Sequence, residues 1–247
     1  MRCPTSTPFG FLMKSGDSCW SLDYVVSEEL VEEAGASAEG GGRRVCDLCG
    51  RPSRVCWCPF VPRPPIQITS EVVVLQHPNE DKRGIRTARM AELGIAGGRC
   101  AVYKGRKFPG SVERLREIFS DEENTFLLYP GSDSSPLEDV VAQRRVGGGK
   151  EGAHLTFILL DGTWDEARKL LTWNPSLRRL KRASLSAAAP GRRRSRYVVR
   201  TQPADGCLST VESVAEALAA VEEGWSCEEV DALCAPLDAM CNTQGRT

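Results

Sequence analysis

Short apolar runs alternate with amphipathic stretches from residue 70 onward. Four runs have the length and β-branched composition of buried strands: residues 71–75, 100–103, 125–129 and 155–160. Four segments carry apolar residues at helical spacing: residues 87–93, 112–119, 136–143 and 164–171. Strands that alternate with helices predict an α/β fold with a mainly parallel sheet.

Three of the predicted helices have a capping box at their start, in which a Ser or Thr is followed three residues later by a Glu. These are Ser135-Pro136-Leu137-Glu138, Thr163-Trp164-Asp165-Glu166 and Ser209-Thr210-Val211-Glu212. The first two lie just beyond an apolar strand. Because ligands of open parallel sheets bind outside the carboxyl ends of the strands, where helix starts present unpaired N–H groups, we expect a cofactor at these junctions.

The two ends of the chain differ from this pattern. Residues 1–42 show little periodicity and end in a glycine-rich stretch, which predicts a flexible lead. Residues 209–241 indicate two helices separated near Gly224, with Cys227, Cys234 and Cys241 on one face of the second. Free cysteine packs as a small hydrophobic side chain, so we expect these thiols to face the core.

The composition is that of a globular chain: 247 residues, 41% hydrophobic and 26% charged. No run approaches the roughly 18 apolar residues of a membrane helix, and the amino terminus lacks a signal-peptide core. The expected location is therefore the cytoplasm, the nucleus or both, without membrane attachment.

Positive charge is concentrated in one part of the chain. Residues 140–206 contain 14 Lys and Arg against five acidic residues, whereas residues 207–247 contain eight acidic residues and a single Arg. Basic clusters at 178–182 and 192–200 surround a loop with glycine and proline. A polyanionic partner is favoured over a nuclear-localisation signal or a solvated surface.

Four of the 11 cysteines form a C-x2-C and a C-x-C pair separated by six residues: Cys46, Cys49, Cys56 and Cys58. Four thiolates at this spacing suit tetrahedral zinc. Because the set supplies all four ligands, the zinc should be structural. The alternative is four unligated cysteines, for which a segment this short offers little core.

The segment after the first strand, residues 76–89, contains His77, Arg83, Arg86 and Arg89. Such residues at the end of a strand suit phosphate contacts. A solvated helix face and a hydrogen-bonded structural histidine are the alternatives. His154 has no acidic or cysteine neighbour, so we expect a structural role and no catalytic triad.

Asp161-Gly162-Thr163-Trp164 ends an apolar run and begins a helix. Gly162 permits a tight or left-handed turn, Thr163 can cap the helix, and Trp164 offers a flat wall for an adenine, a nucleobase or the core. Asp161 could accept a proton or hold an amino group. It could equally accept hydrogen bonds from the turn itself.

Taken together, these segments resemble the DTW-domain family of the TDD superfamily, whose members are tRNA-uridine aminocarboxypropyltransferases. The matching pieces are Cys46-x-x-Cys49…Cys56-x-Cys58, Gln76-His77-Pro78-x-Glu80, Arg86-Thr87-Ala88, Leu128-Tyr129-Pro130, Asp161-x-Thr163-Trp164 and Leu208-Ser209-Thr210-x-Glu212. They occur in the family's order across residues 43–222, which makes the resemblance more specific than any single motif.

The resemblance implies a SPOUT-like fold with a knotted carboxyl-terminal part, tRNA as acceptor and S-adenosylmethionine as donor. The 3-amino-3-carboxypropyl group would move to N3 of a uridine, with release of methylthioadenosine. The pattern along the chain and the resemblance together predict a lead (1–42), a zinc knuckle with a proline-rich spacer (43–66) and a catalytic domain with a helical tail (67–247).

Site residues follow from the resemblance and the residue chemistry together. The donor pocket is expected at Leu128, Tyr129, Pro130, Ser132, Asp161, Gly162, Leu208, Ser209, Thr210 and Glu212, and the catalytic residues are Asp161, Thr163 and Trp164. The RNA-binding set is His77, Arg83, Arg86, Arg89, Arg192, Arg193, Arg194, Arg196 and Arg200. We expect Asp161 to act as general base or to orient the donor amino group, while Thr163 and Ser209 hold the donor carboxylate.

Two other functions are consistent with these features. One is methyl transfer or rRNA modification with the same donor, because fold and donor do not fix the reaction. The other is a zinc-knuckle RNA-binding protein without catalysis, for which the cysteines and arginines would suffice.

Overall fold

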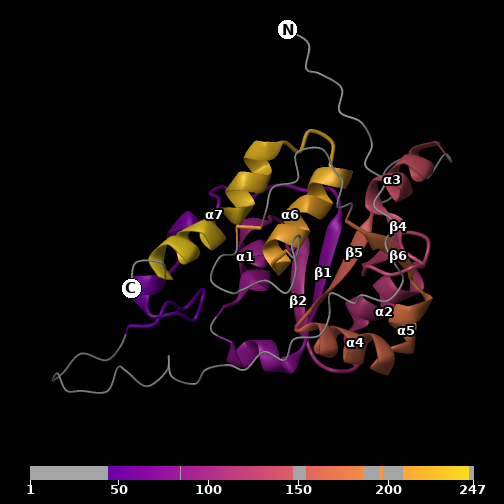
Figure 1. Ribbon diagram of the computed structural model, residues 1–247, viewed down its shortest axis with the longest axis horizontal. Helices are drawn as coiled ribbons and strands as arrows, with labels where there is room; N and C mark the ends of the chain where they lie inside the picture. Colours follow the sequence, from indigo (N-terminus) through magenta and orange to yellow (C-terminus); the bar gives the residue numbers. More distant parts are fainter. Residues whose placement is uncertain (1–43, 84, 147–153, 186–194, 197–207, 245–247) are drawn as a thin grey trace, which may run out of the picture. The chain divides into compact units, whose positions relative to one another are not determined.

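Six parallel strands form the central sheet in the order β2-β1-β5-β3-β6-β4 (Figure 1). The strands are β1 (Glu71–Gln76), β2 (Cys100–Lys104), β3 (Thr125–Leu128), β4 (Ser135–Pro136), β5 (Thr156–Asp161) and β6 (Lys181–Ser184). The four strands predicted from apolar runs are confirmed, as is the parallel sheet. The short strands β4 and β6 were not predicted, because Lys181 and Arg182 give β6 a polar sequence.

The computed structural model describes residues 44–83, 85–146, 154–185, 195–196 and 208–244. The predicted lead at residues 1–42, and Arg192, Arg193, Arg194 and Arg200, lie outside this part. The predicted knot depends on the path of residues 186–194 and 197–207, which also lie outside it, and stays a prediction. None of the described helices is long and apolar enough to cross a membrane.

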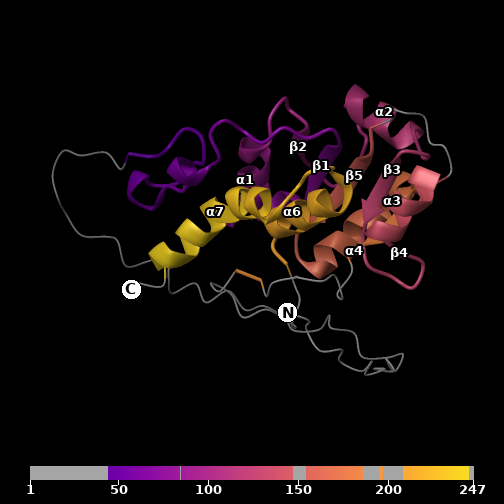
Figure 2. The same cartoon turned by 90° about the horizontal axis from the view of Figure 1, so that it is seen from above.

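Helices cover both faces of the sheet (Figure 1, Figure 2). They are α1 (Thr87–Gly94), α2 (Glu113–Ser120), α3 (Leu137–Val146), α4 (Trp164–Trp173), α5 (Pro175–Arg179), α6 (Thr210–Val221) and α7 (Cys227–Gln244). Short 3-10 helices occur at Ser53–Val55, Cys58–Phe60 and Pro78–Lys82. The predicted capping box at Ser135 is replaced by strand pairing, because Ser135 and Pro136 join β6 and α3 begins at Leu137.

Alternate residues of each strand enter two separate cores. Val72 and Val74 of β1 pack with Phe126 and with residues of α1, α3, α6 and α7. Val73 and Leu75 face the opposite core, which α2, α4 and α5 cover. Since both faces are buried, the strands are continuously apolar and do not alternate with polar residues. This arrangement leaves the carboxyl ends of the strands as the edge on which side chains can form a site.

The carboxyl-terminal helices pack into the first of these cores. Gly224 has a φ of 77° and separates α6 from α7, as the sequence predicts. Cys234 and Cys241 are buried, which confirms the expectation for these two thiols. Cys227 is exposed, so the expectation for it is wrong; it opens α7, where the first turn extends beyond the packed face.

Glu222, directly after α6, fastens this helix to the start of β1. Its carboxylate accepts hydrogen bonds from the backbone N–H groups of Thr69, at 3.0 Å, and Ser70, at 2.7 Å, and from the Thr69 hydroxyl, at 2.8 Å. Burial alone would raise the pKa of Glu222, but these hydrogen bonds outweigh it and lower the pKa below its usual 4.5. The carboxylate therefore stabilises the folded state in its ionised form.

We expect Glu222→Gln to lower the free energy of unfolding by about 1 to 3 kcal/mol at pH 7, the usual value of hydrogen bonds to a charged group. A carboxyl whose pKa is depressed by folding stabilises the protein fully above its unfolded pKa and loses this effect as the pH falls through the folded pKa. Urea unfolding at pH 7 and below pH 4 should therefore show a difference between variant and parent that shrinks in acid. An equal difference at both values would contradict the role.

Candidate functional site

Asp161 lies at the point where two strands and a helix meet. It ends β5 in register with Gln76, which ends β1. The Gln76 side-chain amide donates to Asp161 Oδ2 at 2.7 Å, and the Thr210 hydroxyl of α6 donates to Oδ1. Asp161 is buried, with 8% of its surface exposed. Its carboxylate thus holds together β1, β5 and the start of α6, three elements far apart in the sequence.

Gly162 is required for close packing at this turn. A Cβ atom there would lie 3.0 Å from Cβ of Glu166 and 3.3 Å from Cβ of His77. Its φ is not positive, so the left-handed alternative is wrong and close approach is the reason for glycine. A side chain here would push the start of α4 away from the residues that follow β1.

Thr163 begins α4 through the predicted capping box. Its hydroxyl accepts from the Glu166 N–H at 3.3 Å, and Glu166 Oε2 accepts from the Thr163 N–H at 2.8 Å. Glu166 also accepts from the side-chain amide of Asn79 at 2.8 Å and from Arg83. Burial raises the pKa of Glu166, but the hydrogen bonds and Arg83 outweigh it and lower the pKa overall. An ionised Glu166 therefore stabilises the Asp161–Trp164 turn through these hydrogen bonds.

His77 is buried against the same turn. Its Nδ1 accepts from the Asn79 N–H at 3.3 Å and lies 3.4 Å from Glu166 Oε1. Burial lowers the pKa of His77, and Arg106 adds to this effect, although Glu166 opposes it. This environment favours the neutral imidazole. RNA binding by His77 stays a prediction.

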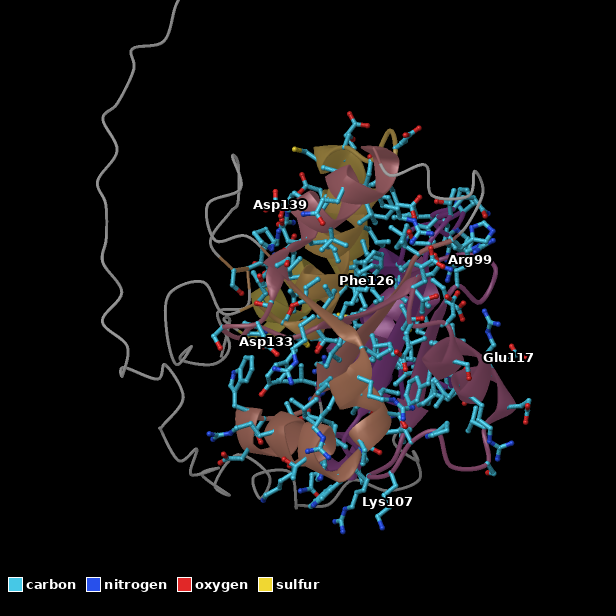
Figure 3. The ribbon with its side chains drawn as sticks, turned by 90° about the vertical axis from the view of Figure 1, so that its right-hand side faces the viewer. Arg99, Lys107, Glu117, Phe126, Asp133 and Asp139 are labelled. Carbon is cyan, nitrogen blue, oxygen red and sulfur yellow. The ribbon has the colours of Figure 1, made fainter. Side chains whose placement is uncertain are left out.

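Two aromatic rings lie between the end of β3 and the start of α4. The rings of Tyr129 and Trp164 are 6.0 Å apart at an angle of 60°. Arg182 of β6 lies 5.8 Å from the centre of the Tyr129 ring and pairs with Asp133 at 2.8 Å; Asp133 is labelled in Figure 3. Both rings are half-buried. They provide two apolar ring surfaces set at an angle, where a single flat wall was expected of Trp164. An adenine or a nucleobase can pack against such a surface.

The start of α6 completes the junction. The Ser209 N–H donates to Glu212 Oε2 at 2.8 Å, and the same buried carboxylate accepts from the Ser195 hydroxyl and the Arg196 N–H. The predicted capping box at Ser209 is confirmed, because the Ser209 side chain faces the Glu212 N–H while Glu212 accepts from the Ser209 N–H. The Ser209 hydroxyl has no hydrogen bond of normal length within the described residues. A covered hydroxyl at the amino end of a 12-residue helix can still bind an anionic group.

The predicted donor-pocket residues fall into two groups. Asp161 ends β5 and Gly162 follows it, beside the start of α6, where Thr210 donates to Asp161 and Ser209 donates to Glu212. Leu128 and Tyr129 come from the neighbouring strand end, and Leu208 directly precedes Ser209. Pro130 and Ser132 are exposed in the loop beyond β3. Gln76 contacts Asp161 but is not among the predicted site residues. The signal that could have identified it is a polar side chain at the carboxyl end of a buried strand.

Three predicted RNA-binding arginines are engaged within the protein. Arg83 pairs with Glu80 and with Glu166. Arg89 pairs with Glu92 and donates to the Leu48 carbonyl. Arg196 pairs with Asp231 and, at 2.7 Å, with Asp238 of α7. Arg86 also has an interaction within the chain. Phosphate contacts by these side chains stay a prediction and would compete with the ion pairs.

The four predicted zinc ligands converge. The sulfur atoms of Cys46, Cys49, Cys56 and Cys58 all lie within 4.8 Å of one another. The Cys46–Cys58 and Cys49–Cys56 sulfur distances are 3.8 and 3.7 Å. Tetrahedral zinc with Zn–S bonds of about 2.3 Å requires sulfur separations of about 3.8 Å. The cluster is therefore compatible with a zinc site.

The four sulfur atoms have different surroundings. Backbone N–H groups of Cys49 and Leu48 lower the pKa of Cys46 to about 6, whereas burial raises the pKa of Cys56 and Cys58. Cys49, Cys58 and the buried Trp57 belong to the same core as α7. The cysteine cluster is thus joined to the main fold and has the character of a structural site.

Comparison with known proteins identifies the family of the chain. The family described as DTW domain matches residues 43–245. A tRNA-uridine aminocarboxypropyltransferase 2 of Drosophila melanogaster is 41% identical over 213 residues, covering 85% of this chain and 79% of its own. The protein of the same name in Mus musculus is 34% identical over 245 residues, covering 98% and 73%.

A more distant relative extends the comparison to plants. A tRNA-uridine aminocarboxypropyltransferase A of Arabidopsis thaliana is 25% identical over 194 residues, covering 73% of each chain. No solved structure matches the chain.

Proposed function

The chain belongs to the DTW domain family, and we propose that it is a tRNA-uridine aminocarboxypropyltransferase with S-adenosylmethionine as donor. The observation that carries the proposal is the junction around Asp161. There a buried carboxylate, two helix starts and an aromatic pair meet at the carboxyl edge of a parallel sheet. An adenosine-containing donor with a charged amino acid end requires groups of these kinds.

We assign each part of the donor to groups near Asp161 that can still contact a ligand. Tyr129 and Trp164 supply an apolar wall for the adenine ring. The N–H groups at the start of α6 suit the donor carboxylate, and the Ser209 hydroxyl beside them has no hydrogen bond of normal length among the described residues. Thr163 Oγ1 accepts a hydrogen bond within its cap and can still donate its own proton.

The reaction forms a bond from uridine N3 to Cγ of the donor's methionine part, the chain carbon attached directly to sulfur, and breaks the bond from that carbon to sulfur. The sulfonium of the donor supplies the leaving group, which departs as methylthioadenosine. N3 must lose its proton, and we assign this proton to Asp161 or, if Asp161 faces the donor amino group, to solvent. Each Asp161 oxygen already accepts one hydrogen bond and has a second lone pair.

Positioning supplies most of the catalysis in this proposal. The donor methyl group is the more accessible carbon, so the site must hold uridine N3 in line with the chain carbon instead. The hydrogen bonds from Gln76 and Thr210 fix the Asp161 carboxylate in one orientation. A fixed carboxylate can direct either the amino end of the donor or N3 of the uridine.

Zinc is proposed as a structural ion at Cys46, Cys49, Cys56 and Cys58. The SPOUT-like knot, the three-part division at residues 42 and 66, and the arginine contacts to tRNA phosphates belong to the same proposal.

The by-product distinguishes the possible reactions. Incubation with donor and tRNA is expected to release methylthioadenosine in an amount equal to the modified uridine, measured by chromatography with mass detection. S-adenosylhomocysteine would instead indicate methyl transfer, and rRNA can replace tRNA as a comparison acceptor. Absence of donor binding by calorimetry would favour an RNA-binding protein without catalysis.

A further inference from the structure

Trp173, the last residue of α4, has 40% of its surface exposed. Its ring centre lies 6.5 Å from the imidazole of His77, at an interplanar angle of 32°. His77 in turn approaches Gly162 of the candidate site. A large aromatic ring is therefore exposed to solvent next to the Asp161 junction. The residues assigned to the donor belong to that junction.

Asn174 holds the loop that follows β2 next to this ring through hydrogen bonds. Its side-chain oxygen accepts from the Phe108 N–H at 2.6 Å, and its amide donates to the carbonyls of Arg106, at 3.0 Å, and Leu170, at 2.6 Å. Asn174 is 1% exposed. The loop after β2 is thus fixed against the end of α4, and Arg106 is held close to Trp173.

Three exposed cations belong to the two segments that meet beside this ring. Arg106 and Lys107 come from the attached loop, and Lys169 is one helical turn before Trp173 on the same face of α4. Arg106 and Lys169 are both close enough to His77 to lower its pKa. Figure 3 shows Lys107 projecting away from the protein at the edge where the orange helices lie.

These cations differ from the arginines first expected to bind RNA. Arg83, Arg89 and Arg196 are held by carboxylates. Arg106, Lys107 and Lys169 have no ion pair with any carboxylate in the portion of the chain that the structure describes. Their charge is therefore available to an anionic partner.

We propose that Trp173, Arg106, Lys107 and Lys169, here called the Trp173 platform, bind an unpaired nucleotide next to the target uridine of the tRNA. The inference rests on the proposed function. The indole stacks on the base, because every base has a π face, and the three cations contact the phosphates on either side. Single-stranded RNA is recognised by this combination of aromatic rings and cations.

Trp173→Ala is expected to raise the Kd for tRNA about 10- to 100-fold, the usual effect of losing one stacked base. Trp173→Phe keeps an aromatic face and should stay within about threefold. Fluorescence anisotropy with labelled tRNA, in the absence of donor, measures both. The melting temperature and calorimetric donor binding should be unchanged, because the ring is exposed and is not assigned to the donor.

The salt dependence of binding tests the cations separately. Replacing Arg106, Lys107 and Lys169 together by Ala should reduce the slope of log K against log salt by about 2, since each lost phosphate contact removes about 0.7 from the slope for a single strand. Two matched controls lie elsewhere: Phe60→Ala removes an aromatic side chain that is 53% exposed, and Arg116→Ala removes a cation paired with Glu113. Both should bind tRNA like the parent.

The outcomes separate the platform from the proposed function. Parental tRNA affinity in Trp173→Ala and an unchanged salt slope in the triple variant, in a protein that still modifies tRNA, would overturn the platform alone. Equal weakening by Trp173→Ala and Trp173→Phe would overturn stacking. A parent protein that neither binds tRNA nor releases methylthioadenosine would overturn the proposed function itself.

Discussion

Replacement of Asp161 by Asn is expected to reduce kcat/KM for aminocarboxypropyl transfer about 100- to 10,000-fold, the range for a positioned acid–base group. The substitution puts an NH2 group where the carboxylate accepts from Gln76 or from Thr210. If Asp161 takes the N3 proton, kcat falls; if it holds the donor amino group, KM for the donor rises. Steady-state kinetics with each substrate varied in turn separates the two roles.

A matched variant removes only a hydrogen bond that orients the Asp161 carboxylate. Gln76→Leu deletes one of the two hydrogen bonds to Asp161 and leaves the carboxylate in place. We expect it to lose about 10-fold in activity, in line with one hydrogen bond of roughly 1 kcal/mol or slightly more. An Asp161→Asn protein that is folded and fully active would exclude any role of this carboxylate in the reaction. Equal losses in both variants would leave Asp161 with only a structural role.

Removal of the proposed zinc ion is expected to have the largest effect on stability. Cys49 and Cys58 belong to the core that also contains residues of α7, and the Leu48 carbonyl accepts from Arg89 of α1. Loss of the ion releases four sulfur atoms that lie within 4.8 Å of one another. We expect a strong chelator, or Cys58→Ser, to lower the melting temperature by about 10 to 20 °C, which corresponds to roughly 5 kcal/mol in a chain of this size.

Cys100→Ala is the control for this experiment, because Cys100 is buried but lies outside the cluster. It should keep one zinc per chain by elemental analysis, whereas Cys58→Ser should lose it. A protein that contains no zinc after purification with zinc present, and melts at the same temperature with and without chelator, would contradict the structural ion.

The sequence was sufficient to predict the elements whose pattern is local. The central strands are buried on both faces, so each is a continuous apolar run. The start of α4 is local too, because Thr163 and Glu166 form a reciprocal cap. In contrast, β6 contains Lys181 and Arg182, and β4 consists of Ser135 and Pro136. Their pairing depends on neighbours distant in sequence, which no local pattern encodes.

The sequence predicts the individual segments of the candidate site but not the contacts between them. The Asp161 turn and the two helix starts follow from short motifs and from the resemblance to the family. The contacts from Gln76 and Thr210 to Asp161 join residues 85 and 49 positions apart, so they required the fold. Likewise, a basic cluster in a sequence does not show which arginines already have carboxylate partners, as Arg196 does with Asp238.

The proposed reaction is tested most directly by mass spectrometry of nucleosides from unmodified tRNA treated with the purified protein and S-adenosylmethionine. We predict a uridine that carries one 3-amino-3-carboxypropyl group at N3, formed by the parent and, to a far smaller extent, by Asp161→Asn. Unchanged uridine throughout the tRNA, or a methylated nucleoside in its place, would contradict the proposed function.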